Sequence, residues 1–180
     1  MSRIPTPSSI DAAPANARPL LEGVNKMLGS VPNLFRIVAT SPAALEGYLG
    51  MFGALGKGTL PAPTRERIAL AIAEYNGCSY CLSAHTYLGK NLAKLTEEEI
   101  SANRHGSSSD PKAAAAVSFA VSVAHQKGRV TESEFKAVKD AGYTDEQIVE
   151  IILHVALNVF TNYLNETLQT EVDFPLVTPN

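Results

Sequence analysis

Helix-start signals recur along this chain at short intervals and constrain its fold more than any other feature. Capping boxes of the form Ser/Thr-x-x-Glu/Gln precede helical segments at three places: Thr96 with Glu99, Thr131 with Glu134, and Thr144 with Gln147. The alternation of apolar and polar residues that indicates strands is absent, apart from the weak candidate RIVAT at 36–40. The sequence therefore predicts an all-α fold, a compact bundle of about seven or eight helices.

Other residues mark further boundaries between helices. Ser41 and Pro42 have the types preferred at the cap and first position of a helix. A later helix contains the apolar run 68–73, which is typical of a buried helix, and Gly77 follows as a stop signal. Residues 1–19 are rich in Pro, Ser and Ala, so we expect an extended N-terminal arm followed by one helical domain at 20–180.

Composition narrows the classes of function. The 180 residues are 45% hydrophobic and 18% charged, with a net charge of -3 and no runs of Lys or Arg. The sequence therefore has no cluster of basic residues of the kind that binds nucleic acid or an anionic membrane. No uninterrupted apolar run has the ~18 residues of a spanning helix, and the N-terminus has no apolar signal region. We expect a soluble, cytoplasmic protein without a nucleic-acid or membrane partner.

Both cysteines lie in one short segment, NGCSYCLSAHT, with a histidine close behind them. On a helix, Cys78, Cys81 and His85 fall within about 60° of one another. A break at Gly77 would put Cys78 at the N-terminus of the new helix, where the helix dipole favours a thiolate. The spacing suits a reactive dithiol in which one sulfur attacks, the other resolves, and an imidazole lies one turn away.

Two other interpretations of the cysteines remain open. They could be small buried core residues. They could also bind zinc together with His85 and a carboxylate, although the remaining histidines, at positions 105, 125 and 154, are scattered and supply no second ligand pair. A thioredoxin fold is disfavoured because no βαβ pattern surrounds the motif. We therefore expect no metal and no cofactor.

A carboxylate upstream could support the histidine. If the helix that carries Glu66 packs antiparallel to the cysteine helix, Glu66 lies near His85 and can orient its imidazole. Alternatively, Glu66 is a surface residue between Arg65 and Arg67, favoured in a first turn by the dipole. Glu74, at the other end of the same helix, is expected to be in solvent.

Polar residues of the last predicted helix, together with Tyr80, are candidates for a pocket. His154 and Asn158 are four residues apart on the last predicted helix, and Asn162 continues this polar stripe. The stripe could line a pocket, or its members could be buried and satisfied by backbone partners. Tyr80, between the cysteines, could form a wall of the site or simply pack.

The pattern Glu66, eleven residues, Cys78-x-x-Cys81-x-x-x-His85 resembles the alkylhydroperoxidase D core of the carboxymuconolactone decarboxylase-like superfamily. The closing segment NVFTNYLNETLQTEVDFP is similar to the end of its uncharacterised peroxidase-related branch. The resemblance implies an all-α homo-oligomer in which the cysteines are a redox pair and the Glu and His form a proton relay. The family often has a second relay histidine next to the second cysteine, where this chain has Tyr80.

These observations predict a thiol-dependent peroxidase, an antioxidant enzyme that reduces hydroperoxides. We expect Cys81 to attack, Cys78 to resolve, and a dithiol protein to reduce the disulfide, while Glu66 and His85 move protons. The converse assignment, with Cys78 attacking from its position at the helix end, stays open. The alternatives are a helical redox-sensing or metal-binding module, and decarboxylase-like chemistry with His85 as base. Because segment 148–160 is apolar on more than one face, we expect a dimer or an assembly of dimers with the last helix in its interface.

Overall fold

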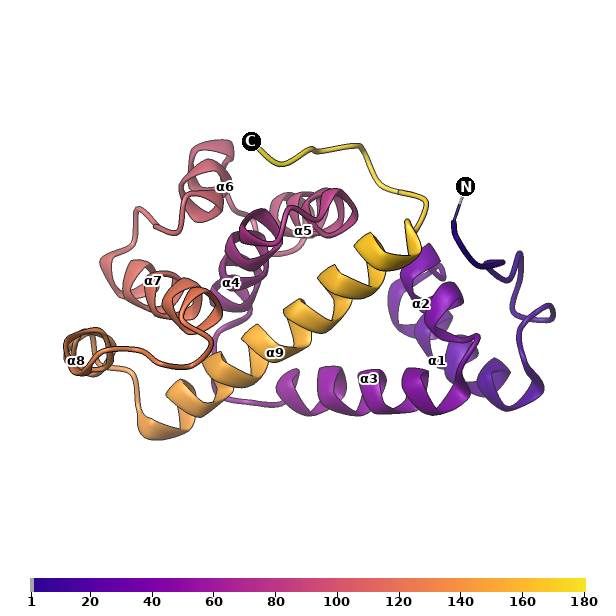
Figure 1. The fold of residues 1–180 in the computed structure, drawn as a ribbon, viewed down its shortest axis with the longest axis horizontal. Coiled ribbons are helices and arrows are strands. Elements are labelled where there is room, and N and C mark those ends of the chain that lie inside the picture. Colours follow the sequence, from indigo (N-terminus) through magenta and orange to yellow (C-terminus); the bar gives the residue numbers. More distant parts are fainter. Residues whose placement is uncertain (1) are drawn as a thin grey trace.

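The computed structural model describes residues 2–180, and within this range its regular elements are all helices (Figure 1). They are η1 (a 3-10 helix, Ala15–Ala17), α1 (Arg18–Leu28), α2 (Asn33–Val38), α3 (Pro42–Leu55), α4 (Ala62–Tyr75), α5 (Ser79–Asn91), α6 (Glu97–Arg104), α7 (Pro111–His125), α8 (Glu132–Asp140) and α9 (Asp145–Leu168). The all-α prediction is confirmed. The weak strand candidate at 36–40 is wrong, because most of it lies in α2.

Local capping explains where the helices begin. The boxes at Thr131 and Thr144 are complete, with both the hydroxyl and the backbone N–H of the cap engaged, and they start α8 and α9. The box at Thr96 is only half formed. Its hydroxyl accepts a hydrogen bond from the backbone N–H of Glu99. The Glu99 carboxylate instead accepts a hydrogen bond from Arg67 of α4 at 2.7 Å, so it ties α6 to the body of the molecule.

Helix α9 is the central element. It runs diagonally between α3 on one side and α4 and α5 on the other (Figure 1), and it also contacts α7. By length and composition alone α9 is apolar enough to cross a membrane. The core helix of a folded domain meets the same criterion, and residues such as Ile151 and Leu157 of α9 are buried inside the molecule.

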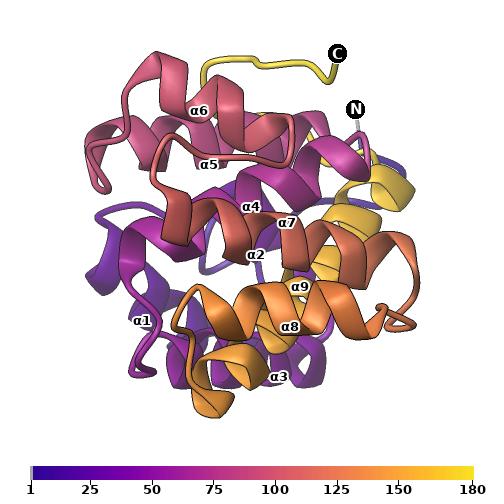
Figure 2. The same cartoon turned by 90° about the vertical axis from the view of Figure 1, so that its left-hand side faces the viewer.

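The apolar core has two main parts. One contains α1, α2, α3 and the beginning of α5, with Leu21 and Leu45 fully buried. The other contains α4, α7, α8 and α9 (Figure 2), with Ile72 and Ile151 fully buried. Both cysteines belong to the first part, next to the faces of α4 and α9 that join the two.

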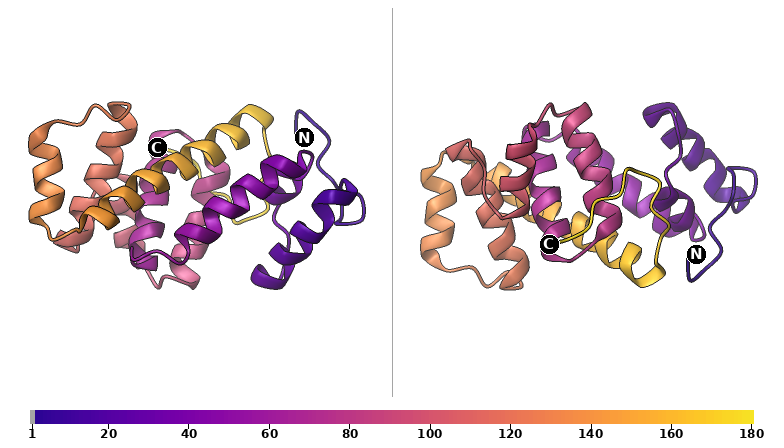
Figure 3. Two further views of the ribbon diagram at one scale, coloured as in Figure 1. Left: turned by 90° about the horizontal axis from the view of Figure 1, so that it is seen from below. Right: turned by 90° about the horizontal axis from the view of Figure 1, so that it is seen from above.

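Both terminal segments pack against the helices. The backbone N–H of Arg3 donates to the Leu168 carbonyl at the end of α9. The chain then has no α-helix until Arg18. After α9, residues 169–180 run back over α5 (Figure 3), where the Val177 N–H donates to Ser83 Oγ at 2.9 Å.

Candidate active site

A sharp break between α4 and α5 positions the two cysteines. Gly77 has a φ of +67°, a left-handed conformation that glycine adopts at little cost. Cys78 follows in an extended conformation as the N-cap of α5, and its Sγ accepts a hydrogen bond from the Cys81 backbone N–H at 3.3 Å. The cysteines therefore share the first turn of α5, with Cys78 at its start as the Gly77 signal predicts.

The two thiols have different acidities. A hydrogen bond from the Cys78 thiol lowers the pKa of Cys81 to about 7 despite burial, and the His85 charge and the Asn165 amide act in the same direction. The hydrogen bond to Cys81, together with burial, raises the pKa of Cys78 well above its ordinary value. Cys81 is therefore the thiol that ionises near neutral pH, and Cys78 keeps its proton.

Glu66 and His85 meet where α4 and α5 pack side by side. The distance from Glu66 Oε2 to His85 Nδ1 is 2.9 Å, so the contact expected from antiparallel packing is present. Burial alone lowers the pKa of His85, but the Glu66 carboxylate outweighs it and the net pKa is raised. A positively charged imidazole held in this way stabilises the Cys81 thiolate.

Helix α9 adds amide groups on the other side of the sulfur atoms. Asn165 Nδ2 donates to Cys81 Sγ at 3.3 Å. Asn162, which is fully buried, accepts a hydrogen bond from Asn76 at 2.9 Å. The polar stripe predicted from the sequence includes Asn162 but not Asn165. Asn165 lies three residues further along the same polar stripe, and helical spacing was the signal that would have found it.

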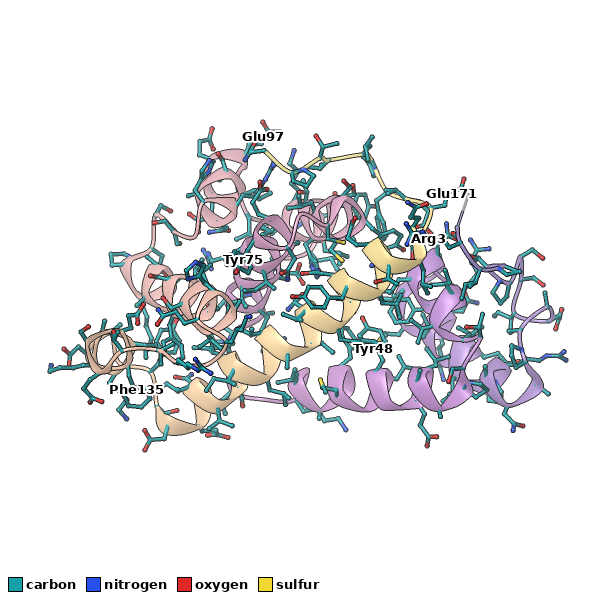
Figure 4. All side chains as sticks on the ribbon, in the orientation of Figure 1. Arg3, Tyr48, Tyr75, Glu97, Phe135 and Glu171 are labelled. Carbon is teal, nitrogen blue, oxygen red and sulfur yellow. The ribbon has the colours of Figure 1, made fainter. Side chains whose placement is uncertain are left out.

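A cavity of about 350 Å³ opens beside Cys81, between α3, α4, α5 and α9. Its lining includes Cys81, His85, Glu66, Tyr80, His154 and Asn158, so the sequence candidates other than Cys78 and Asn162 lie on its wall. Cys78 is completely buried behind Cys81. Tyr48 of α3 also lines the cavity and points from α3 toward α9 (Figure 4), a position that sequence reasoning missed.

Besides lining the cavity, Tyr80 forms hydrogen bonds through its hydroxyl to two other segments of the chain. Its hydroxyl donates to Asp173 Oδ1 at 2.8 Å and accepts a hydrogen bond from the Leu34 backbone N–H at 3.0 Å. Burial raises the pKa of Tyr80. The side chain at the position of the family's second histidine is therefore bonded to the C-terminal segment and α2, and not to Cys81.

His154 and Asn158 lie in the α9 wall of the cavity. The Asn158 side-chain amide donates to the backbone carbonyl of His154 at 2.8 Å. His154 is buried, and within residues 2–180 its Nε2 has no hydrogen-bond partner. Burial and the nearby charge of Arg65 lower the pKa of His154 to about 4, so the imidazole is neutral at pH 7.

Residues 42–117, which contain α3 to α6 and the first half of α7, match the carboxymuconolactone decarboxylase family. This segment is similar to the core of the carboxymuconolactone decarboxylase family. It contains Glu66, Cys78, Cys81 and His85, so the resemblance drawn from the motif is confirmed. No match is found among curated proteins.

Solved structures give the same fold around the family core. A protein from Ralstonia eutropha JMP134, described as an alkylhydroperoxidase AhpD core and uncharacterized peroxidase-related protein, is 28% identical, with a TM-score of 0.84 over 96% of this chain and 92% of that one. A peroxidase-related protein from Silicibacter sp. TM1040 is 22% identical, with a TM-score of 0.81 over 94% and 91%. The debrominase Bmp8 is 21% identical, with a TM-score of 0.78 over 93% and 91%.

The α9 wall of the cavity lies outside the matched family core. His154, Asn158 and Asn165 come from α9, which begins well after residue 117. The matched segment therefore supplies the thiols, the imidazole and the carboxylate, and α9 supplies another part of the cavity wall.

Proposed function

We propose that the protein is a thiol-dependent peroxidase that reduces hydroperoxides through a dithiol/disulfide cycle of Cys78 and Cys81. The observation that carries this proposal is the arrangement at Cys81, which combines a low thiol pKa, a place on the cavity wall and a second thiol in the same turn. The thiolate is the nucleophilic form of cysteine, so a pKa of about 7 makes Cys81 reactive at physiological pH.

The first step is attack by the Cys81 thiolate on an oxygen of the hydroperoxide. The O–O bond breaks, the leaving alkoxide takes a proton to become an alcohol, and Cys81 becomes a sulfenic acid. His85 supplies this proton, and Glu66 holds its ring by the Nδ1 contact of 2.9 Å. Glu66 and His85 therefore act together as the proton relay in this proposal.

The second step is condensation of the two cysteines. The Cys78 sulfur attacks the Cys81 sulfenic acid, water leaves with the Cys78 proton, and an intramolecular disulfide forms. A partner dithiol protein then returns two electrons by thiol–disulfide exchange. Because cytoplasmic thiols are kept reduced, a cytoplasmic location is part of the proposal.

The cavity favours an organic hydroperoxide over hydrogen peroxide. Its volume of about 350 Å³ falls in the range of small-molecule sites, and Leu34, Phe52 and Leu157 give it apolar walls. A carbon chain or ring beside the peroxide group would bury apolar surface there, whereas hydrogen peroxide would not.

Thiol counting together with a turnover assay tests the cycle. One equivalent of tert-butyl hydroperoxide should remove two free thiols per chain without crosslinking chains, and a small dithiol should restore both. Excess dithiol should then sustain peroxide consumption. Two free thiols remaining after peroxide treatment would contradict the mechanism.

Reductive dehalogenation is a second candidate function. Its support is the apolar cavity beside a reactive dithiol, together with the likeness in fold to the debrominase Bmp8. The Cys81 thiolate would take the halogen from an aromatic carbon, which gains a proton, and Cys78 would displace halide to form the same disulfide. Bromide release from 2,3,4-tribromopyrrole, compared with peroxide loss under equal dithiol, separates the two functions.

Two other candidates from the sequence have less support. Within residues 2–180, no three or more His, Cys, Asp or Glu side chains are arranged to hold a metal ion, so the structure adds nothing to a metal-binding module. Decarboxylation with His85 as base gives no role to the thiols. In a lactone decarboxylation assay it predicts full activity in a Cys78→Ser, Cys81→Ser double variant, whereas a peroxidase loses its activity in that variant.

A further inference from the structure

One end of the cavity is polar in a way that the peroxidase chemistry does not use. Arg65 of α4 and His154 of α9 both line this end, and the Arg65 charge acts on the His154 imidazole. Neither residue belongs to the group formed by Cys78, Cys81, His85 and Glu66. The two side chains therefore need another explanation.

Arg65 is a half-buried cation without an anion. Its Nη1 donates to the Leu55 carbonyl at 3.0 Å, and it forms no ion pair within the described residues. The two carboxylates nearest to this end are already engaged. Glu66 is bonded to His85, and Glu150 accepts hydrogen bonds from the backbone N–H groups of residues 59 and 60. The remaining guanidinium donors of Arg65 can therefore serve an anion from outside the chain.

His154 is a polar side chain left without a partner at the same end. Its exposed fraction is 6%, and Nε2 forms no hydrogen bond inside the described chain. An unsatisfied buried polar atom costs about 1–3 kcal/mol, and a bound ligand that accepts or donates a hydrogen bond removes this cost. An anion beside Arg65 would also offset the positive charge that disfavours a proton on His154.

The rest of the cavity requires an apolar body in the ligand. Phe52, Leu34 and Leu157 line the same cavity as Arg65 and Cys81. We infer that the substrate is an organic acid, whose carboxylate binds Arg65 and His154 and whose apolar body fills the cavity beside Cys81. This inference rests on the proposed function only in assigning the acid as substrate, because the binding itself requires no chemistry.

Equilibrium binding of two probes with the same apolar chain tests the carboxylate site. Octanoate should bind at least tenfold more tightly than 1-octanol in calorimetry, since hydrogen bonds to charged groups contribute about 10- to 100-fold in affinity. Arg65→Gln should abolish this preference, and Arg129→Gln, which removes an exposed arginine outside the cavity, should leave it unchanged. Equal affinity for both probes in the native protein would overturn the inference, as would failure of octanoate to bind.

Variants of His154 and a kinetic comparison complete the test. His154→Gln keeps a hydrogen-bonding group and should retain part of the octanoate preference, whereas His154→Leu should lose it by a factor of about ten. In turnover, Arg65→Gln should raise KM for a carboxylate-bearing hydroperoxide and leave KM for its methyl ester unchanged. Octanoate binding by a protein that consumes no peroxide would contradict the proposed function and leave the carboxylate site standing. Peroxide turnover by a protein that does not bind octanoate would contradict the carboxylate site and leave the proposed function standing.

Discussion

The sulfur atoms of Cys81 and Cys78 are neighbours with different surroundings. Cys81 lies on the cavity wall and is the more acidic thiol, whereas Cys78 is enclosed and keeps its proton. We expect Cys81→Ser to abolish reaction with hydroperoxide. Cys78→Ser should still react once per chain and stop at a sulfenic acid that dimedone traps, which mass spectrometry would detect. Dimedone labelling at residue 78 in Cys81→Ser would reverse the assignment.

The acidity of Cys81 gives a pH dependence with a definite sign. Because the thiolate is the reactive form, the rate of alkylation by iodoacetamide should rise with pH, with a midpoint at about 7. The Cys78 thiol is the largest cause of this low pKa, so Cys78→Ala should move the midpoint upward, toward the ordinary value of about 8.5. An unchanged midpoint would mean that the Cys78 hydrogen bond has no such effect.

Glu66 should act on the reaction through His85. Glu66→Gln removes the negative charge 2.9 Å from Nδ1, which lowers the pKa of His85 and weakens its support for the thiolate. Peroxide turnover should fall by about 10- to 100-fold while the helical circular dichroism stays unchanged. Glu22→Gln, which changes an exposed carboxylate on α1, is the matched control. Equal turnover in both variants would show that Glu66 is only a surface residue.

At the scale of elements, the Tyr80 hydroxyl joins three parts of the chain, since it bonds α5 to Asp173 and to the backbone of Leu34. Tyr80→Phe leaves the buried Leu34 N–H without its partner, so the free energy of unfolding should fall by about 1–3 kcal/mol. Urea denaturation measures this loss. Tyr87→Phe is the control, because Tyr87 is 46% exposed and should change stability by less than about 0.5 kcal/mol. Equal stability of the two variants would contradict the role of Tyr80.

Local sequence signals predicted most of the elements, because capping and helix breaks depend on neighbouring residues. The break at Gly77 located the cysteine turn, and the boxes at Thr131 and Thr144 located two helix starts. Contacts between distant segments could not be predicted in this way. Glu74 was expected in solvent, which is wrong: its side chain is 13% exposed and pairs with Arg104 at 2.6 Å. The place of Tyr48 on the cavity wall likewise depends on how α3 crosses α9, for which the sequence carries no local signal.

At the scale of the whole molecule, α9 has a second apolar face directed outward. Its exposed large residues are Val149, Ile152, Leu153, Phe160 and Tyr163. Apolar side chains in a continuous helical patch are typical of a subunit interface. We therefore expect a homo-oligomer, a dimer or an assembly of dimers, in light scattering at micromolar concentration. A mass of 19.2 kDa, that of one chain, would contradict this, and Ile152→Glu should shift an oligomer toward that mass.

The position of both sulfur atoms in the first turn of α5 bears on the energetics of the redox cycle. A bond between Cys78 and Cys81 would close a ring of only four residues. In the chain-entropy model, so small a ring restricts the unfolded chain little, and it contributes about 2 kcal/mol, less than a bond between distant segments. The oxidised protein would then be more stable than the reduced one by about 2 kcal/mol, which is less than the roughly 5–15 kcal/mol that holds a typical domain folded, so reduction would not by itself unfold the chain.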